Sequence, residues 1–124
     1  MKAMAAISMG LGVALAAFTY PSSAHAEGTA PVIEVVTLTL RKGVTPAQFD
    51  QVDREVQVDY ISKRKGFLSR ESAPGGDNKW LVVVHWQSVA DADASMKSFS
   101  TAHAASAFMA MVEPNSMVMT RYGR

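Results

Sequence analysis

The sequence of 124 residues has no cysteine and only three histidines. Without cysteine there is no disulfide framework, and without an H-x-x-x-H pair the usual pattern of a zinc or metalloprotease site is missing. The motifs G-x-S-x-G, G-x-x-x-x-G-K-[ST] and G-x-G-x-x-G are also absent, which removes the commonest hydrolase, nucleotide and dinucleotide signatures. We therefore expect no metal site, assign no cofactor, and expect the hydrophobic core alone to hold the fold.

The first 26 residues are typical of an export signal. Lys2 precedes an apolar run at residues 3–18, and residues 24–26 form the cleavage pattern Ala-His-Ala. The run contains serine and glycine and is shorter than the roughly 20 residues that span a bilayer, which disfavours the alternative of a membrane anchor. No cysteine follows it, which excludes a lipid-anchored lipoprotein. We expect cleavage after Ala26 and a periplasmic or secreted protein with no membrane segment.

The remaining chain is one domain without a dominant charge. Removing 26 of the 124 residues leaves 98, with a short polar leader at 27–31 and the domain at 32–124. Lys2 is the only charged side chain removed, so the 12 basic residues become 11, against 11 acidic ones. A neutral surface has no electrostatic reason to bind nucleic acid or anionic lipid, so we expect neither as a partner.

Hydrophobic patterns predict alternating strands and helices. Thr45 and Gln48 form a capping box around Pro46 at the start of one helix, and Ser88 caps a second. The first helix should bury a stripe at helical spacing and end before Gly66. The stripe contains Phe49, Val52, Val56 and Tyr60. Strands are predicted at 32–40, 67–72, 80–84 and 116–122, a turn at 73–78, and a further helical piece at 104–112.

This order, β-α-β-β-α-β, predicts an α+β, ferredoxin-like fold with a four-stranded antiparallel sheet. Two helices can cover only one face of that sheet. The strands at 32–40 and 80–84 carry apolar side chains on both faces, so the second face needs a cover. We expect a second copy to supply it, giving a homodimer joined through the sheet faces as a dimeric α/β barrel.

Three features of the sequence indicate a known family. They are the order of elements, Gly66-Phe67 at the start of a strand, and Trp86-Gln87-Ser88 at a strand-to-helix junction. In these three features the sequence resembles the antibiotic biosynthesis monooxygenase family of dimeric α/β barrels. The resemblance covers about residues 32–122. It implies a cofactor-free oxygenase of aromatic compounds, a haem-degrading enzyme or a quinol-linked enzyme. The asparagine and tryptophan of the haem-degrading branch have no counterpart here, which leaves only His103. Many relatives have a histidine where this chain has Ser95.

The candidate catalytic residue is His85, which lies in the most apolar predicted strand. Burial there would keep its imidazole neutral and able to act as a general base. The alternative is a structural histidine of the core or of an interface, satisfied by one hydrogen bond. Trp86 and Phe99 would form walls for a flat aromatic substrate, although Trp86 also fits a plain core position.

The remaining candidates would bind the substrate. Tyr60 or Arg70 would orient it, but Tyr60 also fits the buried helix stripe and Arg70 also fits a solvated pair with Glu71. His103 faces either the space between helix and sheet or solvent. Several methionines near the chain's end would line an adaptable apolar pocket or simply fill gaps in the core. They are Met109, Met111, Met117 and Met119.

The sequence leaves two functions open. The first is a cofactor-independent monooxygenase, in which a base deprotonates a small aromatic or quinol-type compound held between helices and sheet, and the anion reacts with dioxygen. The second is a non-catalytic dimeric periplasmic module that binds a small apolar ligand or a protein. Aromatic and methionine side chains favour the first, and Ser95 in place of a histidine favours the second.

Overall fold

The computed structural model describes residues 30–123, so the predicted signal at 1–26 lies outside the described residues. The predicted order of strands and helices is confirmed, and the further helical piece is a third α-helix. The elements are β1 (Val32–Thr39), α1 (Pro46–Glu55), η1 (Val56–Tyr60), η2 (Ile61–Lys63), β2 (Phe67–Pro74), β3 (Lys79–Trp86), α2 (Val89–Phe99), α3 (His103–Ala110) and β4 (Val118–Gly123).

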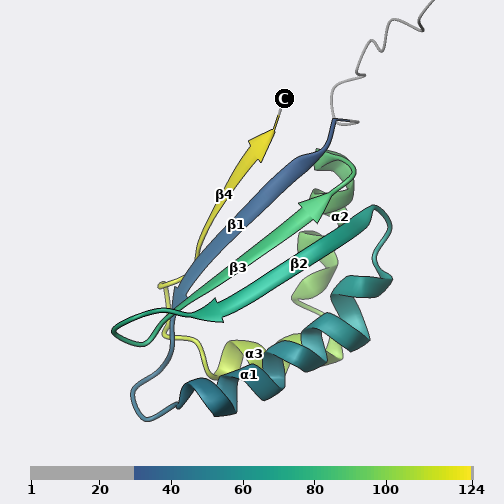
Figure 1. The fold of residues 1–124 in the computed structure, drawn as a ribbon. Coiled ribbons are helices and arrows are strands. Elements are labelled where there is room, and N and C mark those ends of the chain that lie inside the picture. The colour runs from purple at the N-terminus through teal and green to yellow at the C-terminus, as the bar shows by residue number, and fades with distance from the viewer. Residues whose placement is uncertain (1–29, 124) are drawn as a thin grey trace, which may run out of the picture.

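The four strands form one antiparallel sheet in the order β2-β3-β1-β4. β1 and β3 are central, and β2 and β4 are the edges, as expected of a ferredoxin-like sheet. All three α-helices lie on the same side of it (Figure 1). Within residues 30–123 no helix is long and apolar enough to cross a membrane.

The predicted helix starts are confirmed by their hydrogen bonds. The Thr45 hydroxyl accepts the Gln48 N–H at 3.2 Å, and the Gln48 side chain accepts the Thr45 N–H at 2.9 Å. At α2 the Ser88 hydroxyl accepts the Asp91 N–H at 3.1 Å. Each bond satisfies a backbone donor that the first helical turn leaves free, so these residues determine where the helices begin.

The first helix differs from the expected continuous α-helix after Glu55. Its next five residues, η1, form a π-helix, and η2 is a turn of 3₁₀-helix. The predicted stripe is nevertheless buried throughout, and Ile61 is buried as well. The change of helix type keeps Tyr60 and Ile61, which are consecutive, on the covered side. A π-turn inside a helix is rare and often occurs beside a functional site.

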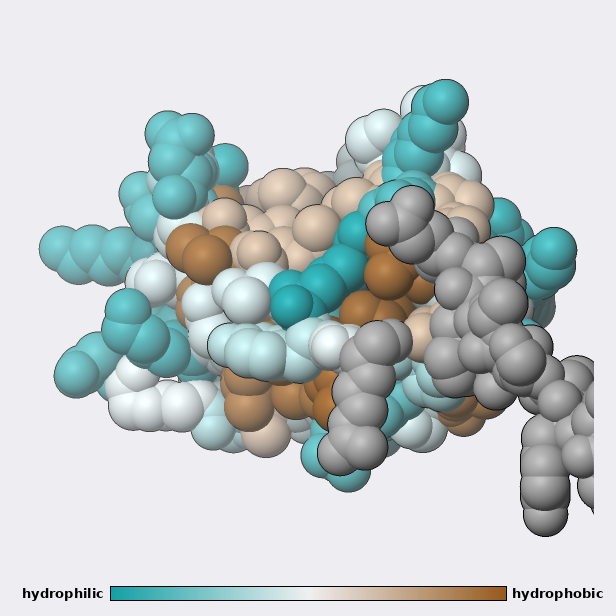
Figure 2. All heavy atoms as spheres, turned by 90° about the horizontal axis from the view of Figure 1, so that it is seen from above, coloured by the Kyte–Doolittle hydropathy of each residue, from teal (hydrophilic) through white to brown (hydrophobic). Residues whose placement is uncertain are grey.

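The core lies between the helices and one face of the sheet. Alternate residues of β3 point into it, and Phe49 packs against Trp80 and Phe108 with ring centroids 4.8 and 4.9 Å apart. The other face, here called the open face, carries large apolar side chains that remain exposed. They are Ile33, Leu81, Val118 and Tyr122. Apolar side chains are also visible between hydrophilic ones when the molecule is viewed from above (Figure 2).

Candidate functional site

Four residues form a row across the helix-covered face of the sheet. Arg70 on β2 pairs with Val84 on β3, Val84 pairs with Glu34 on β1, and Glu34 pairs with Arg121 on β4. Neighbours in such a row are roughly 5 Å apart, so three charged side chains share one line on a buried face. We call these four residues the transverse row.

Arg70 is held by an aspartate from α1. Its Nη1 and Nη2 atoms donate to Asp53 Oδ2 and Oδ1 at 3.0 and 2.5 Å, and each side chain is only 5% exposed. The proposed solvated pair of Arg70 with Glu71 is therefore wrong. Adjacent strand residues point to opposite faces, so Arg70 points under the helices while Glu71 is exposed.

Arg121 links Glu34 to α2 at the other end of the transverse row. Its Nε donates to Glu34 Oε2 at 3.0 Å, and its Nη1 donates to Asp93. The Glu34 side chain is 5% exposed and that of Asp93 is 62% exposed, so the chain of charges runs from core to surface. Burial alone would lower the pKa of Arg121, but its hydrogen bonds and charge contacts with Asp93 and Glu34 raise it above the ordinary value.

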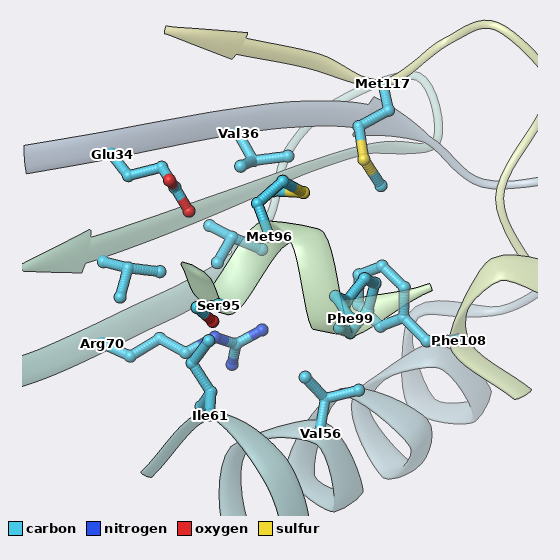
Figure 3. A pocket seen from close by; sticks show the side chains of 12 residues that line it. Glu34, Val36, Val56, Ile61, Arg70, Ser95, Met96, Phe99, Phe108 and Met117 are labelled. Carbon is cyan, nitrogen blue, oxygen red and sulfur yellow. The ribbon is translucent and has the colours of Figure 1, made fainter. Parts of the chain in front are cut away.

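A cavity lies between the transverse row and the helices (Figure 3). With its mouth it contains about 510 Å³ free of protein atoms, of which about 60 Å³ admits the centre of a water-sized sphere. That interior is roughly four to six times the 10–15 Å³ needed by one water. Its polar groups come from Glu34, Arg70 and Ser95. The apolar lining is Val36, Val56, Ile61, Val82, Val84, Met96, Phe99, Phe108 and Met117.

Two predicted substrate-binding residues, Phe99 and Arg70, line this cavity, and Tyr60 supports its wall. The Tyr60 hydroxyl donates to the Ser95 carbonyl oxygen at 2.6 Å and lies 2.5 Å from the Ser98 hydroxyl. Its ring packs against Phe99 with centroids 5.5 Å apart. Tyr60 thus fixes the position of α2, and its hydroxyl is already engaged there.

His85 does not reach the cavity. It alternates with Val84 and Trp86 on β3 and therefore lies on the open face, where it is half-buried. The expected placement of His85 as a buried base between helices and sheet is wrong, because the helices cover the opposite side of its strand. The structure does not bring His85 and Phe99 together around one space.

Trp86 and His103 also lie outside the cavity. Trp86 is fully buried and packs edge-on against Phe67 with ring centroids 6.1 Å apart, which is a core position. His103 is exposed at the start of α3, beside a separate surface depression that Glu55 and Asp59 also line. Neither residue is a wall of the cavity or faces its interior.

Two buried carboxylates of the site, Glu34 and Asp53, were not predicted from the sequence. Glu34 is in phase with the buried Val36 and Leu38, and Asp53 lies one helical turn after Phe49. A charged residue at an inward position was the signal available. Of the four methionines named above, Met117 lines the cavity. Across residues 30–123 no cluster of three histidine or acidic side chains is arranged to hold a metal ion.

No protein-family model matches the sequence, and no curated protein matches it either. Solved structures do match. SnoaB of Streptomyces nogalater, a cofactor-independent oxygenase, is 16% identical with a TM-score of 0.63, over 75% of this chain and 91% of SnoaB. A putative antibiotic biosynthesis monooxygenase of Bordetella bronchiseptica is 10% identical with a TM-score of 0.65, over 77% and 97%.

A dimeric ferredoxin-like protein of unknown function from Thermobifida fusca is 13% identical with a TM-score of 0.60, over 77% of this chain and 92% of its own. Because the sequence identities are low, these structural matches establish the fold alone. The chain has the ferredoxin-like fold of antibiotic biosynthesis monooxygenase-type proteins, as the sequence resemblance implied.

Proposed function

We propose that this chain is a small monooxygenase that needs no cofactor and oxidises a small aromatic or quinol-type compound in the cavity under the sheet. The observation that carries the proposal is the cavity itself, an apolar space with a few polar groups in its lining. Such a composition suits a ligand with an aromatic body and a hydroxyl group. The fold shared with SnoaB, an oxygenase described as cofactor-independent, supports the same reaction class.

An anthrone-like substrate illustrates the proposed reaction. In the enol form of this compound, a base removes the proton of the ring hydroxyl. The resulting anion transfers electrons from its ring carbon to dioxygen, and the peroxide formed on that carbon takes the proton back to give a hydroperoxide. The hydroperoxide then loses water and leaves a ketone, so that one oxygen atom enters the product and the other becomes water. The carbon is oxidised and dioxygen is reduced. The protein's task is to hold the ring, accept the proton and exclude bulk water.

The alternative, a binding module without catalysis, is favoured by one observation. Both buried carboxylates near the cavity are already paired with arginines, Asp53 with Arg70 and Glu34 with Arg121. Paired carboxylates stabilise a fold without any chemistry. In that case the cavity would bind a small apolar ligand and leave it unchanged.

The deciding experiment measures oxygen uptake by the purified protein with dithranol, an anthrone, in the absence of added flavin, metal or haem. We expect saturable uptake of one dioxygen per substrate and a quinone product. The control is Ser95→Leu, which fills the cavity from α2 and should abolish uptake. Binding of dithranol with no uptake above the rate in buffer would overturn the enzyme proposal and leave the binding module.

We further propose that the mature protein is exported and forms a homodimer through the open face. The exposed Ile33, Leu81, Val118 and Tyr122 would be buried between two copies, and His85 would be an interface histidine. The Thermobifida fusca protein, which shares the fold, is described as dimeric, and this supports the proposed assembly. The Ala-His-Ala pattern at residues 24–26 supports export.

A further inference from the structure

We propose that Glu34 accepts the hydrogen of a hydroxyl group on the aromatic ligand and is the proton acceptor of the reaction. This inference rests on the proposed function, because it assigns a role within the same cavity. It moves the base from His85 on the open face to a carboxylate on the covered face.

The two buried carboxylates of the site differ in how many of their oxygens already accept a hydrogen bond. Asp53 uses both oxygens, since each accepts one Arg70 nitrogen. Glu34 uses Oε2 for the Nε of Arg121, and no side chain or backbone donor among residues 30–123 bonds its Oε1. A carboxylate oxygen that lacks a donor in a buried site has capacity to accept one from a ligand.

Glu34 is also placed to meet a ligand. Its side chain is 95% removed from solvent yet lines the cavity, and its carboxylate points from β1 toward the space beside Met96 (Figure 3). Val36 and Val84, its neighbours on the same face, are apolar. A hydroxyl bound there would meet an acceptor in surroundings of low polarity, where the hydrogen bond is stronger than in water.

The charged groups around Glu34 fix its orientation. Arg121 on β4 holds Oε2 and is itself held by Asp93 on α2. On the other side of the cavity Arg70 on β2 is neutralised by Asp53 on α1. No titratable side chain from β3 or α3 lines the cavity. Only Oε1 of Glu34 is therefore presented to a ligand. The ligand binds with its hydroxyl group neutral, because the negative charge of the Glu34 carboxylate would repel an ionised hydroxyl.

The test uses 4-nitrophenol, whose visible absorption reports whether the bound molecule is neutral or ionised. We compare the full-length protein with Glu34→Gln, which keeps the shape and removes the charge. The control is Glu71→Gln, the same change at an exposed position on the open face. We expect the wild type and the control to prefer the neutral probe, and Glu34→Gln to shift that preference by at least about tenfold toward the ionised form.

Turnover provides a second readout. With dithranol, Glu34→Gln should lower kcat by about 10² to 10⁴, the usual effect of losing a general base, with a smaller change in KM. Where Glu34→Gln unfolds, the double variant Glu34→Gln with Arg121→Met removes the unpaired guanidinium and allows the same comparison.

The outcomes separate the two proposals. An unchanged preference for the neutral probe in folded Glu34→Gln would overturn the role of Glu34 while the cavity site stands. No binding of probe or dithranol by the wild type would overturn both. A shifted preference without oxygen uptake supports Glu34 as the ligand's acceptor and overturns the oxygenase.

Discussion

Replacing Asp53 by alanine would leave the Arg70 guanidinium charged and without its carboxylate. In the folded protein Asp53 accepts both terminal nitrogens of Arg70, and each side chain is only 5% exposed. Water therefore has little access to the charge that remains. The decrease in the free energy of unfolding should therefore be much larger than the decrease caused by losing an ordinary hydrogen bond.

The expected magnitude follows from this burial. Removing one partner of a buried ion pair costs about 3–5 kcal/mol, against a total stability of roughly 5–15 kcal/mol for a domain of this size. At 4–8 °C per kcal/mol, the melting temperature should fall by roughly 12–40 °C. The double variant Asp53→Leu with Arg70→Met, which replaces the pair by apolar side chains, should be about as stable as the wild type.

Urea unfolding monitored by tryptophan fluorescence and circular dichroism would measure these differences. The control is Asp50→Ala on the same helix. Asp50 pairs with Arg54, and their side chains are 43% and 77% exposed. That change should alter stability by about 0.5 kcal/mol or less. A loss below about 1 kcal/mol for Asp53→Ala, or a double variant as unstable as the single one, would refute the reasoning.

Three further outcomes are expected. Gly66→Ala should destabilise the domain by about 1–3 kcal/mol more than Gly43→Ala in urea titrations, because both positions have positive φ but only at Gly66 would the added methyl group overlap the Asp91 side chain; equal losses would contradict this. The proposed homodimer should sediment at twice the monomer mass at micromolar concentration, and Val83→Asp, on the open face, should give a monomer or an unfolded chain instead; a wild-type monomer would contradict the proposed homodimer. The mass of protein recovered outside the cytoplasm should correspond to a chain that begins at Glu27, whereas a mass that includes the first 26 residues would indicate an anchor.

Local signals were sufficient to predict most of the fold. The capping box at Thr45 and the cap at Ser88 located two helix starts to the residue, because each is a hydrogen bond between positions three apart. The switch to a π-helix at Val56 has no such local signal. It depends on how the helix packs against the rest of the domain, and the spacing of apolar residues alone favours a continuous α-helix.

The site was predicted less well, because it depends on which face the helices cover. On β3, Trp80 and Val82 point to one face of the sheet, and Leu81 and Val83 point to the other. Hydrophobicity alone therefore does not separate the covered face from the open one. His85 was therefore assigned to the wrong space. The structure also shows that a bulge near the start of β2 shifts its register, and alternation alone does not give the side to which Arg70 points.

The π-helix at Val56–Tyr60 makes the length of this helix a constraint on evolution. Successive residues of an α-helix are rotated by about 100° around its axis, so removing one residue rotates everything that follows by that angle. A deletion within 57–59 that restored ordinary helical bonding would turn Tyr60 away from Ser95, or turn Phe49 out of the core. Substitutions at the exposed Val58 and Asp59 leave that geometry intact. Related sequences should therefore vary freely in residue type at these two positions while the number of residues between Phe49 and Tyr60 stays constant.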